Sequence, residues 1–395
     1  MHAITKRLTV ATSDAILRFP WGGWAGWIVF CTIALARVSP RRFASTFTYY
    51  LEAAEKLMTH GHAYEHYLYL PISLVVFAPF TTIDRSLAAG IWLVVYAAVF
   101  TWGCVALTMR LLPQGAGELK AVWLAGVVLL INVPAAWFNF KGVQSQIIMT
   151  GTMLLAAVAI MRAQWLWATF WLFVGIVFKP LALVMALLCA MLCPRMRFPL
   201  VVAAVIALAL PFAFFDAGYM AGQYRDLGLT LWRIANSPAE AWPYRADLST
   251  MLEAFGIALP GLLSVALRLI AALGTLYLAW RVRGTGTLRS LGFALVILSA
   301  CYINLFSPRN EFLSFLVLTP SLAVLAFLVL ARDQGDWRGW LLIVAALVLG
   351  MWWSLAFDAV TKPAIVVVVY GWLAWLMAVP ERWRALVEGD AGSVH

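Results

Sequence analysis

The chain has 395 residues, of which 64% are hydrophobic and only 12% are charged. Soluble domains carry about 25% charged residues, and this chain contains many apolar runs of about 18 residues or more, long enough to span a bilayer. These features exclude an ordinary soluble globular domain. The formal net charge of +10 does not indicate nucleic-acid binding, because most Lys and Arg residues lie in short tracts between apolar runs, as in the cytoplasmic loops of membrane proteins.

The apolar runs predict an all-α polytopic membrane protein with about 12 transmembrane helices, arranged as one domain over residues 1–395. The basic tracts place both ends of the chain in the cytoplasm. The first 19 residues lack the pattern of a cleavable signal peptide, so the first span is expected to be an uncleaved anchor. The expected spans are residues 20–36, 86–110, 119–138, 143–161, 164–178, 180–193, 197–215, 258–282, 287–305, 311–331, 337–357 and 363–379.

A polar segment, residues 37–85, separates the first two expected spans and is predicted to be the first extracytoplasmic loop, with interfacial helices. Residues 49–59 have the period of a short amphipathic helix, with glutamates facing water and Tyr50 on the apolar face. Residues 67–83 are apolar but short and contain two prolines, so we expect them to dip into the membrane interface. If they crossed instead, each basic loop after residue 161 would require an extra crossing.

The same topology predicts that further segments lie outside the membrane. The largest, residues 216–257, is expected to be a second extracytoplasmic loop, with an interfacial helix at residues 219–234, where Tyr, Trp and Arg are mixed. The other segments expected outside are residues 139–146, 179–180, 307–311 and 358–363.

The sequence contains no motif of a soluble-substrate enzyme. No HExxH, GxSxG, Walker or GxGxxG pattern occurs, so zinc-protease, hydrolase and nucleotide-binding functions lack support. The five cysteines lie in or at the ends of apolar runs and are interpreted as small buried hydrophobic residues, not as metal ligands or disulfides. An outward-facing transferase without a nucleotide site would need a lipid-linked donor.

Polar groups near a bilayer are costly to bury, so clusters of them are candidates for function. In NFKGVQSQ, residues 139–146, Lys141 with Gln144 and Gln146 is predicted to open a helix whose free N–H groups point outward, a site for an anion or a sugar. The alternative is a lysine that reaches the headgroups and glutamines that pack against neighbours. Lys179, between two short apolar runs and before a proline, is a candidate to neutralise a phosphate, with the same alternative.

The stretch NLFSPRNEF, residues 304–312, places Arg309 and Glu311 together between two spans. Arginine recognises phosphate or carboxylate with two hydrogen bonds, and Glu311 is a candidate general base, whereas the alternative is a structural Arg–Glu pair. The first loop holds further candidates, most of which are expected to form a solvated face. They are Glu52, Glu55, His60, His62, Glu65, His66, Tyr67 and Tyr69.

The order of these clusters resembles glycosyltransferase family 87, a group of polyprenol-phosphate-sugar-dependent glycosyltransferases of the GT-C superfold. The resemblance covers residues 46–320 and rests on several short motifs in the same order as in the family. In this sequence they read TFTYYLEAAEKL, YLPISLVVFAP, VQSQ, Lys179 followed by a proline, and SPRNE.

The resemblance implies a GT-C-like fold and the transfer of a single hexose, such as mannose, from a polyprenyl-phosphate donor to a lipid or glycan acceptor, with inversion. The reaction would take place at the outer face of a bacterial cytoplasmic membrane. The partners would be the donor, the acceptor and membrane lipids, with no nucleic acid, no cofactor and no metal ion. The family usually carries a catalytic Asp or Glu where this chain has Thr46, so Glu311 and Glu52 are the candidate bases. The residues expected to bind the donor phosphate or sugar are Lys141, Gln144, Gln146, Lys179, Arg309 and Tyr69.

Three other functions stay open from the sequence. A transporter or flippase for a lipid-linked solute would use the same cations, although few charges lie within the expected spans. A polysaccharide polymerase or ligase would transfer a whole glycan from a polyprenyl pyrophosphate. The third is a catalytically inactive member of the family, which Thr46 makes plausible.

Overall fold

The computed structural model describes residues 21–38, 45–65, 67–112, 118–236, 244–307 and 310–388. The expected all-α architecture is confirmed over these ranges, where the only β-type pairing is an antiparallel bridge between Arg245 and Glu311. The helices are α2 (Gly22–Ala36), α3 (Ser45–Met58), η1 (Ala63–Glu65), α4 (Pro71–Phe77), η2 (Ala78–Thr82), α5 (Arg85–Leu111), α6 (Glu118–Ile131), α7 (Val133–Gly142), α8 (Gln146–Met161), α9 (Trp165–Phe178), η3 (Pro180–Ala182), α10 (Leu183–Leu192), α11 (Pro194–Ala209), η4 (Leu210–Ala213), α12 (Ala217–Asn236), α13 (Leu248–Ala254), α14 (Gly261–Thr285), α15 (Leu288–Phe306), η6 (Phe312–Val317), α16 (Thr319–Arg332), α17 (Trp337–Gly350), α18 (Leu355–Ala378) and α19 (Pro380–Glu388).

Within the described ranges, six helical segments are long and apolar enough to cross a membrane, and a seventh span results if the bent pair α6–α7 counts as one. Shorter apolar helices, among them α2, α8, α9 and α17, accompany them. These lengths and compositions indicate a multi-pass membrane protein. Each of the expected spans contains at least one observed helix, although the shorter helices do not reach the length criterion individually.

The span expected at residues 119–138 corresponds to two helices that are long and apolar enough for a span only as a bent pair. The chain bends by 60° between α6 and α7, at Asn132, and continues as a helix to Gly142. Pro134 accounts for the bend, because it has no N–H to donate and its ring clashes with the preceding turn. Asn132 stabilises the break, since its Oδ1 accepts a hydrogen bond from the Thr319 hydroxyl at 2.6 Å.

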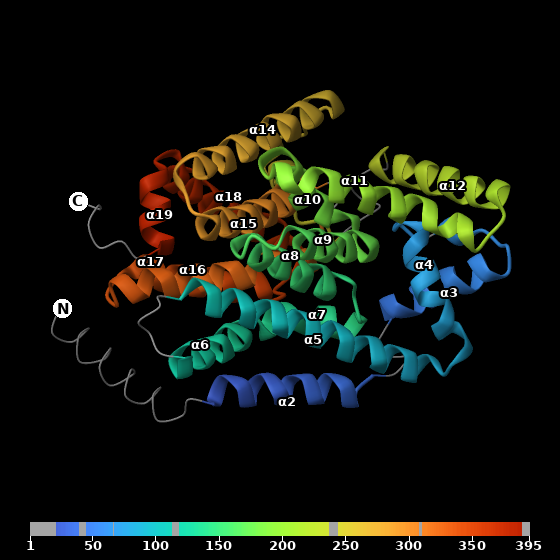
Figure 1. Ribbon diagram of the computed structural model, residues 1–395, viewed down its shortest axis with the longest axis horizontal. Helices are drawn as coiled ribbons and strands as arrows, with labels where there is room; N and C mark the ends of the chain where they lie inside the picture. Colours follow the sequence, from blue (N-terminus) through green and yellow to red (C-terminus); the bar gives the residue numbers. More distant parts are fainter. Residues whose placement is uncertain are drawn as a thin grey trace.

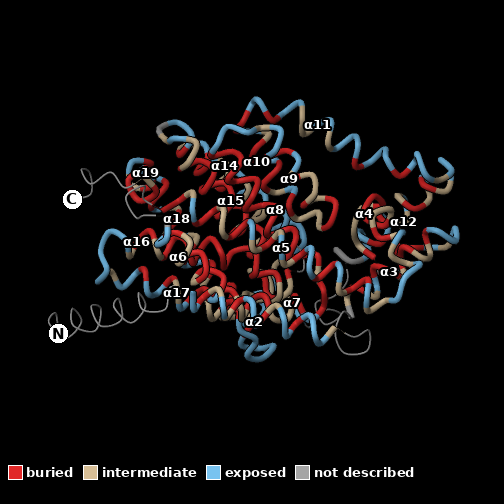
Figure 2. The backbone as a smooth tube through the Cα atoms, turned by 60° about the horizontal axis from the view of Figure 1, so that its bottom comes forward, coloured by how far each residue is buried: buried red, intermediate tan, exposed pale blue. Residues whose placement is uncertain are grey.

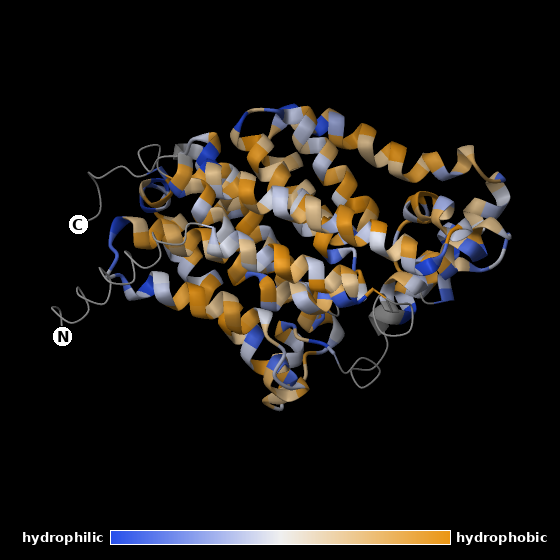
Figure 3. Cartoon of the chain, turned by 90° about the horizontal axis from the view of Figure 1, so that it is seen from below, coloured by the Kyte–Doolittle hydropathy of each residue, from blue (hydrophilic) through white to orange (hydrophobic). Residues whose placement is uncertain are grey.

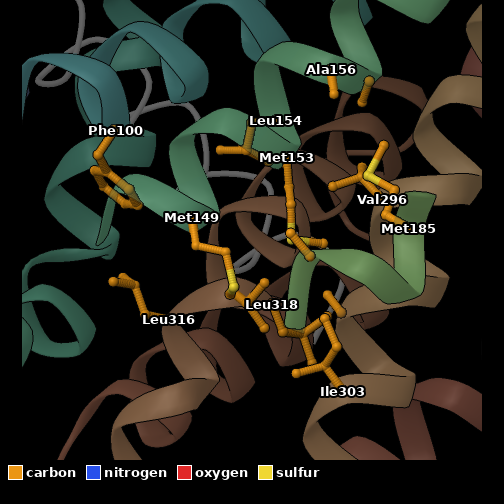
Figure 4. Close-up of a cluster of buried hydrophobic side chains, with 14 of the residues drawn as sticks. Phe100, Met149, Met153, Leu154, Ala156, Met185, Val296, Ile303, Leu316 and Leu318 are labelled. Atoms are coloured by element: carbon orange, nitrogen blue, oxygen red, sulfur yellow. The ribbon is translucent and has the colours of Figure 1, made fainter. Parts of the chain in front are cut away.

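The core of the molecule is built around α8, all 16 residues of which are buried. This helix packs against α5, α9 and α15. Figure 2 shows it at the centre of the molecule, among segments coloured red for buried. Met149 and Met153 of α8 point into a cluster formed with α15, η6 and α10 (Figure 4). Two glycines, Gly103 and Gly151, allow α5 and α8 to approach closely. A Cβ on Gly103 would lie only 2.6 Å from the Gly151 carbonyl oxygen, so no larger residue fits there. Small residues at such crossings let membrane helices approach.

Helices α3, α4 and α12 lie together at one end of the molecule, which we call the cap end (Figure 1, right). The amphipathic helix expected at residues 49–59 is confirmed, and it begins earlier, at Ser45. Its apolar face, including Tyr50, is buried, while Glu52 and Glu55 face Arg85 on the opposite side. His60 then adopts a left-handed φ of 57° and ends the helix.

The helix expected at residues 219–234 is confirmed as α12, which covers the loop around η1. The Tyr219 hydroxyl donates to the carbonyl oxygens of Leu57 and Gly61 at 3.1 and 3.0 Å. The Thr230 hydroxyl donates to the Tyr64 carbonyl oxygen at 2.9 Å. These bonds join α12 to the end of α3 and to the loop around η1, so they hold the cap together.

We call the opposite end, where α19 lies, the basic end (Figure 1, left), because several arginines contact helix ends there. The Arg289 guanidinium donates to the carbonyl oxygens of Leu111 and Leu112, and Arg110 donates to that of Met161. Unsatisfied carbonyl groups at helix ends are favourable partners for cations. Figure 3 shows hydrophobic residues along the sides of the helices and many of the hydrophilic ones toward their ends.

The prediction that residues 358–363 lie in an exposed outer segment is wrong. Helix α17 ends at Gly350, and α18 begins eight residues before the expected position, capped by the Ser354 side chain. Asp358 and Lys362 therefore lie in the first two turns of α18, where they are only 2% and 1% exposed. Their mutual attraction makes this burial possible, because Lys362 Nζ lies 3.7 Å from Asp358 Oδ1.

Candidate functional site

The Tyr50 hydroxyl lies at the centre of a polar site beneath the cap. It is 3.2 Å from the Ser145 hydroxyl and 3.5 Å from the Tyr69 hydroxyl, so one buried contact joins the first loop to the turn between α7 and α8. Tyr50 lies on the buried face of α3. Its ring stacks on that of Phe77, with 5.3 Å between the ring centres. A hydroxyl group on an otherwise apolar face is thereby aimed into the molecule.

Burial keeps the phenols of this site protonated. Desolvation raises the pKa of Tyr50 well above its ordinary value, and the neighbouring Tyr69 raises it further. Desolvation likewise raises the pKa of Tyr67, whose hydroxyl lies 2.6 Å from that of Ser73. Neutral phenols donate and accept hydrogen bonds, which suits them to hold the hydroxyl groups of a sugar.

Lys179 enters the site from the turn between α9 and η3. Its backbone is extended, with φ −154° and ψ 112°, because the following Pro180 disfavours a helical residue before it. The positive charge of Lys179 lowers the pKa of Tyr50 and so opposes part of the rise caused by burial. The neighbouring Phe178 is wedged between aromatic rings, 5.4 Å from Trp92, and this packing fixes the turn.

Glu311 enters the same site from the segment between α15 and η6. Its charge adds to the rise of the Tyr69 pKa that burial causes first. The segment is held by an antiparallel bridge to Arg245, with the Ala246 N–H donating to the Asn310 carbonyl oxygen at 2.7 Å. Lys179 thus acts on Tyr50 and Glu311 acts on Tyr69, and the hydroxyl groups of these two tyrosines lie 3.5 Å apart.

Side chains of α7 and α8 bind the Glu311 segment to the membrane helices. Asn139 Nδ2 donates to the Leu313 carbonyl oxygen at 3.0 Å, and Gln146 Nε2 lies 3.4 Å from that of Ser314. Gln146 is fully buried, and its Oε1 has no hydrogen-bond partner among the described residues. The amide nitrogen of Gln146 thus contacts the backbone of this segment, while its amide oxygen remains able to accept a hydrogen bond.

The turn between α7 and α8 brings Thr46 beside Gln144. A Cβ on Gly142 would lie 3.0 Å from both the Thr46 hydroxyl and the Gln144 side chain, so both side chains lie against this glycine. Val143 closes the turn in a left-handed conformation, with φ 48°. The sequence predicts that Lys141 opens a helix, and this is wrong. Lys141 lies in the last turn of α7, where it is exposed.

The structure separates the remaining predicted residues from this site or leaves them undescribed. Glu52 lies two positions from Tyr50 and on the other side of α3, with its Oε1 3.4 Å from Arg85 Nη1. Glu55 binds the same arginine, and His62 faces Asp226 of α12. Arg309 and His66 lie outside the described residues.

Sequence reasoning missed Tyr50 and Ser145 as members of the site. Tyr50 was interpreted as a packing residue, and Ser145 was passed over between two glutamines. One usable signal was the position of Ser145 directly before α8, where a short polar side chain often marks the start of a helix. The hydroxyl of Tyr96 is also buried here without a hydrogen-bond partner among the described residues, with its ring 6.1 Å from Phe178.

The comparison with protein families finds a match. The family model of glycosyltransferase family 87 matches residues 67–308, which is more than half of the chain and includes Tyr69, Ser145 and Lys179. A search of curated proteins finds no match to the chain.

Proposed function

Because the chain belongs to glycosyltransferase family 87, we propose that it transfers a single hexose from a polyprenyl-phosphate donor to a lipid or glycan acceptor. We place the reaction at the outer face of a bacterial cytoplasmic membrane and expect inversion at the anomeric carbon. The observation that supports this most is the approach of Lys179 and Glu311 to the tyrosine pair Tyr50 and Tyr69. A cation, an anion and neutral hydroxyl groups are the parts that this chemistry needs.

In the proposed reaction, Glu311 acts as the general base. Its carboxylate takes the proton of an acceptor hydroxyl as the oxygen attacks the anomeric carbon, a type of assistance worth about 10²–10⁴-fold in rate. The bond from the anomeric carbon to the phosphate oxygen breaks, and polyprenyl phosphate leaves with the electron pair. Lys179 stabilises the charge that develops on this phosphate.

Other residues of the site are assigned to binding. Tyr69, Gln144 and Gln146 would orient the sugar by hydrogen bonds, and Thr46 beside Gln144 would serve as a further hydroxyl partner. Lys141 is exposed at the end of α7, and we assign it to the phosphate of the approaching donor. We also retain the proposal that Arg309 binds the donor phosphate.

Two features support the proposed orientation with twelve crossings in a GT-C-like arrangement. Each expected span contains observed helix. The arginines of the basic end, such as Arg110 and Arg289, lie away from the cap, and basic residues mark cytoplasmic loops. The cap and the site would then face the opposite side, where only lipid-linked sugars are available as donors.

The test is a transfer assay with the purified protein. Radiolabelled polyprenyl-phosphate sugars are incubated with the protein and a membrane lipid extract, and labelled product is separated from donor. We expect Lys179→Ala to lower the rate about 10²-fold or more, as does the loss of a group that stabilises transition-state charge. Lys120→Ala removes the same charge from an exposed position at the start of α6 and should keep the native rate.

Native transfer by the Lys179→Ala variant would contradict the proposed role of this lysine. Flux of the intact lipid-linked sugar across proteoliposomes, without covalent change, would instead identify a transporter. Transfer of a whole glycan would identify a polymerase or ligase. Folding of each variant is checked by gel filtration before rates are compared.

A further inference from the structure

A small pocket at the basic end is not used by the proposed reaction. Its volume is about 110 Å³, and its walls come from the end of α16, the start of α17, the end of α18 and α19. Three arginines line it, Arg332, Arg338 and Arg382, together with one carboxylate, that of Asp336. The pocket is large enough for several water molecules or one phosphate group.

The helix that carries Arg382 is firmly attached to the membrane helices. On α19, Trp383 is fully buried, donates from its Nε1 to the Ser290 carbonyl oxygen at 3.0 Å and stacks on Phe293 at 5.4 Å. The Arg382 guanidinium then lies 4.4 Å from the centre of the Trp375 ring. Such stacking orients a guanidinium while its N–H groups remain available to an anion.

Arg338 is held in place by Asp336, which it binds through two nitrogens. Arg338 Nε lies 2.9 Å from Asp336 Oδ1, and Arg338 Nη2 lies 2.8 Å from Oδ2. This carboxylate neutralises one of the three positive charges on the pocket wall. The wall therefore retains a formal excess of positive charge and favours an anionic ligand.

The other residues that line the pocket are apolar. Trp372 and Trp375 lie near the end of α18, an apolar helix long enough to cross a bilayer. The Trp375 side chain is half exposed. Tryptophan is enriched at the level of lipid headgroups. A ligand that uses all of this surface needs a negative head beside the arginines and a hydrocarbon part along α18.

We propose that this pocket binds the headgroup phosphate of an anionic membrane phospholipid. The phosphate would lie between the Arg382 and Arg338 guanidinium groups, with charge-assisted hydrogen bonds from both, and the acyl chains would follow the apolar face of α18. A free phosphate ion would satisfy the arginines but not the tryptophan wall. The site is separate from the proposed active site, so either proposal can fail without the other.

The test measures lipid binding to the purified full-length protein in detergent. Phosphatidylglycerol and phosphatidylcholine are titrated separately, and bound lipid is counted by native mass spectrometry and by the shift in thermal unfolding midpoint. We expect tighter binding of phosphatidylglycerol. Arg382→Gln should weaken that binding about tenfold, since the loss of one charge-assisted hydrogen bond corresponds to roughly this factor.

Arg384→Gln is the matched control, because Arg384 lies on the same helix, pairs with Glu388 at 3.3 Å and does not line the pocket. It should bind phosphatidylglycerol as the native protein does. Trp375→Leu removes the stacking partner without changing the charge and should weaken binding severalfold, which keeps the test valid if Arg382→Gln fails to fold. Equal binding of the two lipids, equal loss in both arginine variants, or displacement of phosphatidylglycerol by equimolar inorganic phosphate would overturn the proposal.

Discussion

At the scale of single residues, the two candidate bases lie in different surroundings. Glu311 lies close enough to Tyr69 to raise the pKa of that phenol further than burial does alone. Glu52 is partly exposed and interacts with Arg85, on the face of α3 opposite to Tyr50. Arg85 already occupies one oxygen of the Glu52 carboxylate, so we expect Glu52 to be a poor acceptor for a substrate proton.

We therefore predict that Glu311→Gln lowers the transfer rate by about 10²–10⁴-fold, the usual contribution of a general base. Glu52→Gln removes the same charge from the cap end and should change the rate less than about threefold, within the small effects typical of surface positions. The measurement is the initial rate of sugar transfer at saturating donor. If Glu52→Gln proves the more damaging change, the base has been assigned to the wrong glutamate.

The buried tyrosines predict a loss of stability at alkaline pH. The pKa of Tyr50 is raised by burial above the ordinary value of 10.0, so between that pH and the folded pKa the unfolded chain releases a proton that the folded chain retains. The free energy of unfolding should then fall with rising pH above about 10, by about 1.4 kcal/mol per pH unit for each such tyrosine. Thermal unfolding midpoints from pH 8 to 11 provide the measurement.

Tyr50→Phe should make this alkaline fall less steep, because the phenylalanine has no proton to lose. Tyr49→Phe is the matched control on the same helix, where the ring is 57% exposed and the phenol meets water before and after unfolding. It should show the native pH dependence. Identical slopes in all three proteins would mean that Tyr50 does not stay protonated in the folded state.

At the scale of elements, the Asp358–Lys362 pair links α18 to the segment that carries Glu311. Lys362 Nζ lies 5.4 and 5.6 Å from the ring centres of Phe312 and Phe315, the two aromatic residues that follow Glu311 along η6. Cations over aromatic faces are favourable, and more so when both are desolvated. The ion pair thus contributes to the position of the proposed base.

We predict that Lys362→Met destabilises the protein by about 3–5 kcal/mol, because it leaves the Asp358 carboxylate buried without its partner. The double variant Asp358→Leu with Lys362→Met should recover most of this loss, since no charge then remains buried. The check is the thermal unfolding midpoint of each variant in one detergent, with transfer rate measured beside it. A double variant no more stable than the single one would show that the pair is not the cause.

The elements that the sequence predicts well are those whose polarity matches their surroundings. Residues 219–234 and 287–305 agree with α12 and α15 to within two residues, because caps and hydropathy change at the same places. The start of α18 was missed because Asp358 and Lys362 look like surface charges when each is judged alone. Their pairing is a local contact between positions i and i+4 of one helix. Their burial against Phe312 and Phe315 is a tertiary effect, and hydropathy along the chain contains no sign of it.

The site shows the same division between local and tertiary information. Lys179, Gln144 and Glu311 could be predicted because charged and amide groups between apolar runs are costly unless they serve a function. Tyr50 and Ser145 could not, because a hydroxyl group changes hydropathy little. Only the packing of α3 against the turn between α7 and α8 reveals that they meet.

At the scale of the whole molecule, charge divides between the two ends. The basic end contains arginines that bind helix-terminal carbonyl groups, whereas the cap end carries glutamates and aspartates beside its lysines and arginines. From the positive-inside rule we propose that the basic end lies in the cytoplasm. The placement of the site outside depends on that step.

Cysteine labelling tests this orientation directly. Arg225 of α12 is 76% exposed at the cap end, and Arg195 is exposed near the start of α11 at the basic end. The labelling is done in a Cys31→Ala background, because Cys31 is the one native cysteine that is not buried. In this background, Arg225→Cys should react with a membrane-impermeant maleimide added to intact spheroplasts. Arg195→Cys should react only after the membrane is permeabilised. Reaction of position 195 in sealed cells, with protection of position 225, would show the reverse orientation. The site would then lie at the cytoplasmic face, where nucleotide sugars, and not lipid-linked sugars, are the available donors.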